Sequence, residues 1–136
     1  MQRLLLVVED DFLIRSDVEA SLREEGFDLL LAVNGAEAIS YLDEDVGRFQ
    51  ALVTDIDLGK GPNGWEVAHR ARELSPGLPV IYATGGSQHG WAANGVPESI
   101  LLAKPVLAAQ LLAAIAEKLT EAEMRRAMAK PDQGGT

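Results

Sequence analysis

Five side chains that can bind phosphate or a hard metal ion stand directly after four short apolar runs. They are Glu9 and Asp10 after residues 4–8, Asp55 after 51–54, Thr84 after 80–83, and Lys104 after 100–103. If these runs are parallel strands of one sheet, their carboxyl ends meet at the edge where ligands bind in open α/β folds. Carboxylates, a hydroxyl and an ammonium would then share one pocket. Such a set suits Mg²⁺-assisted phosphoryl chemistry.

Taken singly, most of these residues also have an ordinary structural explanation. Acidic residues at positions 9–11 favour the positive end of a helix dipole, and Asp11 is the expected helix N-cap. Thr84 is of a type common at strand ends, and Lys104 fits an exposed helix start. Asp55 is different, because a charge directly after a buried strand must be paired or solvated in a pocket. The order and spacing of the whole set therefore support the prediction.

The expected chemistry follows from the charges. Three carboxylates brought close together repel one another unless a cation neutralises them. Mg²⁺ is the natural cation, because it prefers oxygen ligands and bridges carboxylates to phosphate. Asp55 can act as the nucleophile and form an acyl phosphate. Lys104 would then pair with one phosphoryl oxygen, and Thr84 would donate a hydrogen bond to another.

The composition predicts one globular domain, since the chain has 136 residues. Lys and Arg number 12 against 21 Asp and Glu, and the resulting net charge of −9 repels nucleic acid and anionic lipid. The absence of cysteine excludes disulfides and thiolate metal sites. Acid at position 9 comes too early for a signal peptide, and no apolar run approaches the about 18 residues of a membrane span. We therefore expect a cytoplasmic protein that binds neither nucleic acid nor membrane.

Short branched apolar runs alternate with segments of helical period, which is typical of parallel strands joined by helices. The expected strands cover residues 4–8, 29–33, 52–54, 80–83 and 100–103. The expected helices cover 12–25, 36–42 and 65–74, with a last helix from Pro105 and a short or loose helix within 85–97. The predicted fold class is α/β, a single doubly wound sheet of five parallel strands. Residues 121–136 are expected to form a frayed or disordered extension.

Five motifs resemble those of the receiver (CheY-like) domain of bacterial two-component response regulators. They are LVVEDD at 6–11, LVTDIDL at 52–58, NG at 63–64, ATG at 83–85 and AKP at 103–105. Together with the strands around them, they extend the resemblance over residues 3–119. The resemblance implies a receiver domain at residues 1–120, a flavodoxin-like strand order of 2-1-3-4-5 and a cis peptide before Pro105.

The resemblance also implies a magnesium site. Carried over position by position, it makes Asp55 the phospho-acceptor. Asp10 and Asp55 would bind Mg²⁺ directly, and the backbone carbonyl of Asp57 would be the third protein ligand. Glu9 would act on the metal through water.

In the same way, the resemblance makes Thr84 and Lys104 the two switch residues. Receivers usually carry an aromatic ring three residues before this lysine, and here that position is Leu101. Residues 79–86 read PVIYATGG and resemble a subgroup of stand-alone receivers with an aromatic-Ala-Thr-Gly sequence. The usual aromatic switch is therefore not expected in this chain.

These observations predict a single-domain response regulator in a two-component phosphorelay. It would accept a phosphoryl group on Asp55 from a histidine kinase or a histidine phosphotransfer protein, with Mg²⁺ as the cofactor. It would signal by contact with a downstream protein. We expect no enzyme activity beyond catalysis of its own phosphorylation and dephosphorylation.

Other functions fit parts of the same pattern. A haloacid-dehalogenase-like phosphatase shares the spacing of Asp55 and Asp57, and Thr84 and Lys104 can fill its next two roles. In that family the acidic pair follows the lysine, whereas here it precedes Asp55. A receiver excised from a longer regulator or hybrid kinase fits the motifs equally well. A non-phosphorylatable module of the same fold and a flavodoxin-like FMN binder fit them less well.

Overall fold

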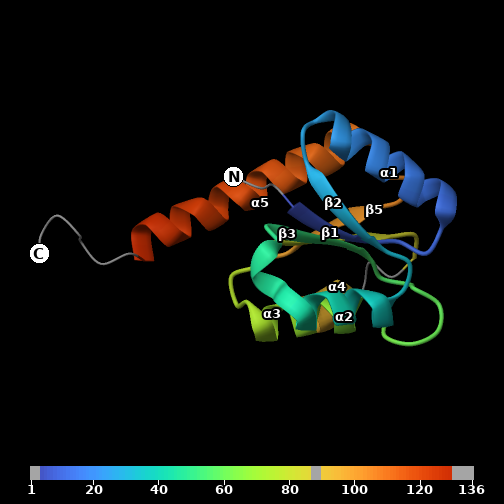
Figure 1. Ribbon diagram of the computed structural model, residues 1–136, viewed down its shortest axis with the longest axis horizontal. Helices are drawn as coiled ribbons and strands as arrows, with labels where there is room; N and C mark the ends of the chain where they lie inside the picture. Colours follow the sequence, from blue (N-terminus) through green and yellow to red (C-terminus); the bar gives the residue numbers. More distant parts are fainter. Residues whose placement is uncertain (1–3, 87–89, 130–136) are drawn as a thin grey trace, which may run out of the picture.

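The computed structural model describes residues 4–86 and 90–129, which form one five-stranded parallel sheet with helices on both faces (Figure 1). The strands are β1 (Leu4–Val8), β2 (Asp28–Ala32), β3 (Ala51–Asp55), β4 (Val80–Thr84) and β5 (Ile100–Ala103). The helices are α1 (Phe12–Glu24), α2 (Gly35–Asp45), α3 (Gly64–Leu74), α4 (Trp91–Asn94) and α5 (Ala108–Ala129), with a short 3₁₀ helix, η1 (Val46–Arg48), after α2. The strand order is β2-β1-β3-β4-β5. The predicted fold class and strand order are thus confirmed.

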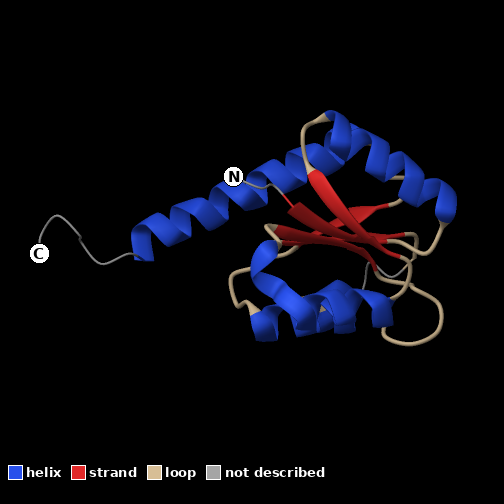
Figure 2. Cartoon of the chain, in the orientation of Figure 1, coloured by secondary structure: helices blue, strands red, loops and turns tan. Residues whose placement is uncertain are grey.

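The helices form two layers, with α1 and α5 over one face of the sheet and α2, α3 and α4 over the other (Figure 2). Successive strand side chains point to opposite faces, so each strand contributes to both cores. Leu5 packs with Leu22 of α1 and Ile115 of α5, whereas Leu6 belongs to the cluster that contains Val67 of α3. All five residues of β3 are buried. A charge at the end of β3 therefore needs a partner.

The sequence-based element positions agree closely with the structure. The strands expected at 4–8 and 100–103 are confirmed as β1 and β5, and the other three overlap β2, β3 and β4 with ends shifted by one residue. The helices expected at 12–25 and 65–74 match α1 and α3 to within one residue at each end. The helix expected at 36–42 is longer and forms α2, and the described residues of the segment 85–97, which are 85–86 and 90–97, include the short helix α4.

The last helix differs from its prediction at both ends. It begins at Ala108 rather than Pro105, after the backbone N–H of Leu107 donates to the Gln110 side chain at 2.9 Å. It continues to Ala129, so the expectation of a frayed chain from residue 121 is wrong for residues 121–129. Residues 122–129 are mostly Ala, Glu, Met and Arg, which are strong helix formers, and Ala122 is buried. Residues 130–136 lie outside the described residues.

Asn63 and Gly64 fix the start of α3 close to the end of β3. The Asn63 side chain accepts the N–H of Glu66, and the Glu66 side chain accepts the N–H of Asn63, each at 3.0 Å. This reciprocal capping box satisfies helix N-terminal donors. A Cβ atom at position 64 would clash with the backbone carbonyl of Asp55 and with Ile56. Glycine is therefore required for α3 to approach β3 this closely.

Within the residues that the structure describes, no helix is both long and apolar enough to cross a membrane.

Candidate functional site

The parallel register of the sheet gathers the predicted residues at one edge. Two acids directly follow β1, one acid and one hydroxyl end β3 and β4, and one lysine directly follows β5: Glu9, Asp10, Asp55, Thr84 and Lys104. β4 and β5 end level with each other, because Thr84 pairs with Ala103. The loops at this edge lie on the right in Figure 1, where α1 also begins. The edge predicted from the sequence is the edge observed.

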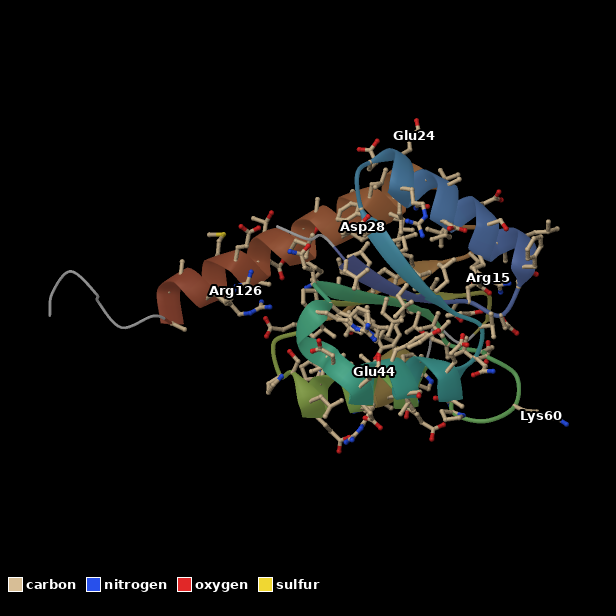
Figure 3. The ribbon with its side chains drawn as sticks, in the orientation of Figure 1. Arg15, Glu24, Asp28, Glu44, Lys60 and Arg126 are labelled. Carbon is tan, nitrogen blue, oxygen red and sulfur yellow. The ribbon has the colours of Figure 1, made fainter. Side chains whose placement is uncertain are left out.

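Lys104 is the cation at the centre of this site. Its Nζ atom lies 2.9 Å from Oδ2 of Asp55 and 3.0 Å from Oε1 of Glu9. Glu9 and Asp55 are only 4% and 6% exposed. Two nearly buried carboxylates are thus compensated by one ammonium, which leaves the pocket with excess negative charge. By contrast, Lys60 at the tip of the loop after β3 points into solvent (Figure 3).

Burial and neighbouring charges shift the pKa values of Glu9 and Lys104. Burial raises the pKa of Glu9 above its ordinary value, and the nearby Asp55 charge raises it further. Hydrogen bonds from the Asp11 N–H and from Lys104 lower the pKa of Glu9 but do not cancel the effect of burial. For Lys104, burial lowers the pKa, and the hydrogen bonds to Asp55 and Glu9 outweigh it and raise the pKa overall. The site therefore holds a firmly protonated lysine beside carboxylates that need positive charge.

The acidic residues offer a site for a metal ion. One oxygen each from Glu9, Asp10 and Asp55 lie within 4.8 Å of one another. Asp10 is exposed, whereas the other two are buried, so the cluster opens to solvent at Asp10. Oδ2 of Asp55 faces Lys104, and Oδ1 lies 3.4 Å from the backbone nitrogen of Asp57. An all-oxygen set open on one side fits Mg²⁺, which keeps several of its waters.

Asp11 caps α1 and is not part of the metal cluster. Its side chain accepts the backbone N–H of Ile14 at 3.0 Å, which confirms the predicted N-cap. Its own N–H donates to Oε2 of Glu9 at 3.1 Å. Asp11 thus orients Glu9 through its backbone while its side chain serves the helix.

Thr84 is fully buried at the end of β4. Its hydroxyl oxygen accepts the N–H of Gly86 at 3.2 Å, so the hydroxyl and the following glycines are linked. The peptide between Lys104 and Pro105 is cis, as the resemblance implied. The chemical roles of Thr84 and Lys104, and the backbone carbonyl of Asp57 as a metal ligand, stay predictions.

Arg15, which the sequence analysis did not identify, and Tyr82, the aromatic residue of the YATG sequence, support this edge. The guanidinium of Arg15 donates to the backbone carbonyl of Glu9 at 2.9 Å, one helical turn after the acids (Figure 3). Tyr82 lies directly opposite Leu101 in the β4–β5 register, is fully buried, and accepts the N–H of Val96 on its hydroxyl at 3.1 Å. A buried aromatic ring thus lies on β4 beside position 101. The position of Tyr82 opposite Leu101 follows from the pairing register, which the sequence alone does not give.

Two hollows differ in their relation to the site. A cavity of about 210 Å³ lies between α1 and the β5–α5 loop (residues 104–107), and its lining includes Asp55, Lys104 and Ile14. A larger groove of about 1210 Å³ lies at the opposite end of the strands, lined by residues such as Phe49 and Arg125. The smaller cavity is the one that adjoins the acidic cluster. Size alone therefore does not identify the functional site.

Comparisons with known proteins point to one family. The family model described as the response regulator receiver domain matches residues 5–116. The transcriptional regulatory protein DltR of Streptococcus agalactiae is 32% identical over 125 residues, which cover 90% of this chain and 54% of DltR. The response regulator receiver protein CpdR of Brucella abortus is 36% identical over 85 residues, which cover 62% of this chain and 68% of CpdR. The chain thus spans about half the length of DltR and two thirds of CpdR.

Solved structures agree. A response regulator receiver protein from Sinorhizobium medicae superposes with a TM-score of 0.86 at 36% identity and covers 89% of this chain and 97% of its own. The receiver domain of a sensor histidine kinase from Pseudomonas aeruginosa, solved with magnesium in its active site cleft, superposes with a TM-score of 0.75 at 23% identity and covers 88% of this chain and 99% of its own. The second similarity shows the fold alone.

Proposed function

Because the chain belongs to the receiver-domain family of response regulators, we propose that it accepts a phosphoryl group on Asp55 from a histidine kinase or a histidine phosphotransfer protein. One observation supports this most directly. A buried carboxylate at the end of a central strand, Asp55, is held 2.9 Å from a lysine ammonium and within 4.8 Å of two further acids. Receiver domains are phospho-acceptor signalling modules, and this arrangement has the parts that such a module needs.

The residues of the site have separate tasks in this proposal. An oxygen of Asp55 attacks the phosphorus of a phosphohistidine, a P–O bond forms, and the P–N bond breaks with its electron pair left on the imidazole. Lys104 stays protonated at neutral pH and pairs with a phosphoryl oxygen, which the raised pKa of Lys104 favours. Thr84 donates its hydroxyl hydrogen to another phosphoryl oxygen. The chain thus catalyses only its own phosphorylation and the hydrolysis that ends it.

Magnesium is the cofactor that this donor set fits. Asp10 and Asp55 would hold the ion directly, with Glu9 acting through water and the Asp57 carbonyl as a third protein ligand. The ion supplies positive charge that offsets the repulsion between carboxylates and phosphate. The magnesium-containing receiver domain from Pseudomonas aeruginosa has the same fold, and the clustered oxygens of Glu9, Asp10 and Asp55 support the assignment.

Exposed apolar side chains beside the site provide a surface for the phosphoryl donor. Phe12 and Leu13, at the start of α1, are 67% and 72% exposed, and Leu107 before α5 is 65% exposed. The small cavity shows that α1 and the β5–α5 loop adjoin next to Asp55. A donor that delivers phosphorus to Asp55 must approach this edge, and apolar surface at a rim favours protein contact.

The proposal includes a stand-alone response regulator that acts in the cytoplasm and signals by contact with a downstream protein. Receiver structures of similar length support the stand-alone form, since this chain covers 97% of the Sinorhizobium medicae protein. DltR supports the other form, a receiver within a longer regulator, because the chain matches only 54% of it. The phosphatase alternative depends on the spacing of Asp55 and Asp57 and on Thr84 and Lys104 as its next two residues, and the family match favours the receiver.

Intact-mass measurement tests the proposal. Incubation with acetyl phosphate or phosphoramidate and Mg²⁺ should add one phosphoryl group to the wild type and none to Asp55→Asn. Mass gain that persists in Asp55→Asn, or in excess EDTA, would contradict the assignment. The same samples should be given p-nitrophenyl phosphate. Sustained turnover that disappears in Asp55→Asn would favour the phosphatase.

A further inference from the structure

The loop between α4 and β5, residues 96–99, is held by contacts from several elements. The buried hydroxyl of Tyr82 on β4 accepts the N–H of Val96 at 3.1 Å. Ser99 Oγ donates to the Val96 carbonyl at 2.7 Å and accepts the indole N–H of Trp91 at 2.9 Å. Arg72 of α3 donates to the carbonyl of Pro97 at 2.6 Å. Three elements around the loop thus fix its conformation.

The backbone of this loop is strained at one residue. Glu98 has a φ angle of +57°, and it is the one residue other than glycine with positive φ in the described part of the chain. This conformation costs free energy for a side chain with a Cβ atom and persists where surrounding contacts over-determine it. The hydrogen bonds that Tyr82, Arg72 and Ser99 make to the loop backbone meet that condition. Loss of one of them would let the loop relax.

One of these contacts comes from Tyr82, which precedes Thr84, the proposed switch residue, by two positions. Tyr82 and Thr84 lie on the same strand and face the same side of the sheet, because side chains alternate along β4. Tyr82 is fully buried, and its ring meets Trp65 of α3 edge-on with 4.8 Å between centroids. Because the ring is held on β4 by this packing, a shift of β4 changes the distance between the Tyr82 hydroxyl and the Val96 N–H.

The other side of the loop reaches the end of α5. The Glu98 carboxylate lies 3.3 Å from the guanidinium of Arg125, and Arg125 also lies 4.0 Å from Glu121. The C-terminal part of α5 extends past the sheet (Figure 1), and Arg125 lies four residues before the end of this helix at Ala129. This exposed ion pair is weak by itself. It nevertheless links the strained residue to the extension of α5, here defined as residues 120–129.

We propose that the loop 96–99 is a strained element that couples the phosphorylation site to the α5 extension. The proposal rests on the proposed function of Asp55. When Thr84 moves toward the phosphoryl group, the end of β4 shifts and the Tyr82–Val96 hydrogen bond lengthens. Glu98 then leaves its positive φ, and its pair with Arg125 opens. The released α5 extension becomes the surface that differs between the two states.

Amide hydrogen exchange with and without beryllofluoride, a mimic of the aspartyl phosphoryl group, tests the coupling in the full chain. In the wild type with Mg²⁺, beryllofluoride should speed exchange in residues 96–99 and 120–129 by about fivefold, the low end of usual coupling between sites. In Tyr82→Phe, both segments should exchange this fast without beryllofluoride and should not respond further. Tyr41→Phe makes the same chemical change on α2 and should behave as wild type.

A second variant separates the two links. Glu98→Gln removes the charge pair and keeps the strained backbone, so the loop should respond to beryllofluoride while the α5 extension does not. Glu123→Gln makes the same change at an exposed acid on α5 itself and is the control, which should keep both responses. Melting temperatures confirm that each variant is folded.

The outcomes are distinct. If beryllofluoride changes exchange near Asp55 but Tyr82→Phe leaves residues 96–99 and 120–129 at wild-type rates in both states, the coupling is wrong and the proposed function stands. The same conclusion follows if the α5 extension of Glu98→Gln responds fully. If beryllofluoride changes nothing and no phosphoryl group is gained, the proposed function itself fails, and the coupling with it.

Discussion

The ammonium of Lys104 lies 2.9 Å from a carboxylate oxygen of Asp55, across 49 positions of sequence. The same ammonium holds Glu9 at 3.0 Å, so one cation compensates two buried acids. Three strands must end level with one another to make this contact. The contact therefore depends on the register of the parallel sheet.

Replacing Lys104 by methionine should destabilise the protein. The change leaves Glu9 and Asp55 buried without their cation, and it should lower the free energy of unfolding by about 3 kcal/mol, the low end for breaking a buried ion pair. Urea unfolding measures it. Lys104→Arg keeps the charge and should lose less. Added Mg²⁺ should restore part of the loss in Lys104→Met, and an unchanged midpoint would show that the pair contributes little.

The raised pKa of Glu9 makes stability depend on pH. Because burial raises this pKa, the folded state holds the proton more tightly than the unfolded chain does. The stability that Glu9 contributes by binding this proton is therefore fully present below the unfolded pKa of 4.5, and it is lost as pH rises through the folded pKa. Glu9→Gln should raise the free energy of unfolding at pH 7 without Mg²⁺, and the gain should vanish at pH 3. A variant less stable than wild type at pH 7 would contradict this.

The neighbouring acids Asp10 and Asp11 should respond oppositely to mutation. Asp10→Ala should weaken Mg²⁺ binding by at least about tenfold, since even outer-shell partners of a metal contribute that much. Asp11→Ala should leave Mg²⁺ affinity near wild type but cost about 1 kcal/mol of stability, because its side chain caps α1. Calorimetric Mg²⁺ titration and urea unfolding of both variants check the pattern. Equal Mg²⁺ affinities of the two variants would mean that Asp10 has been wrongly assigned as a metal ligand in place of Asp11.

The edge that carries the site could be predicted from the sequence because strand ends are local features. Asp55 follows Leu52, Val53 and Thr54, a run that predicts a buried strand, so its charge implies either a partner or a solvated pocket. Asp11 was identified as the cap from its place before the helix. These inferences need only the periodicity of a short segment and the geometry of parallel sheets.

The remaining features depend on contacts between distant segments. The hydroxyl of Tyr82 meets Val96 fourteen residues later, and nothing in either segment indicates the pairing. The extension of α5 was missed because the apolar period ends near Leu119. Its helix is supported instead by helix-forming residues and by pairs such as Lys118 with Glu121 at 2.9 Å.

The exposed apolar rim should matter for a protein donor and not for a small one. Leu13→Asp should slow phosphoryl transfer from a phosphorylated histidine kinase by about tenfold, the effect of losing 1.4 kcal/mol of contact. The rate of phosphorylation by acetyl phosphate should be unchanged, because the exposed Leu13 side chain is not among the groups assigned to bind Mg²⁺ or phosphate. Met128→Asp, on an 82% exposed side chain at the far end of α5, is the control. Equal slowing with both donors would mean that the substitution disturbs the site itself.

The close approach of α3 to β3 should make Gly64 the most sensitive glycine near the site. Gly64→Ala places a Cβ against the carbonyl of Asp55, and relief of the clash requires a backbone shift at the phospho-acceptor. The cost should be about 2 kcal/mol, within the usual range for overpacking. Gly77→Ala is the matched control, because a Cβ there meets no atom within 4 Å. Urea unfolding should show a loss for position 64 alone, and the rate of mass gain with acetyl phosphate should fall in the same variant. If Gly64→Ala is less stable but is phosphorylated at the wild-type rate, the position of the Asp55 side chain does not depend on the close contact between α3 and β3.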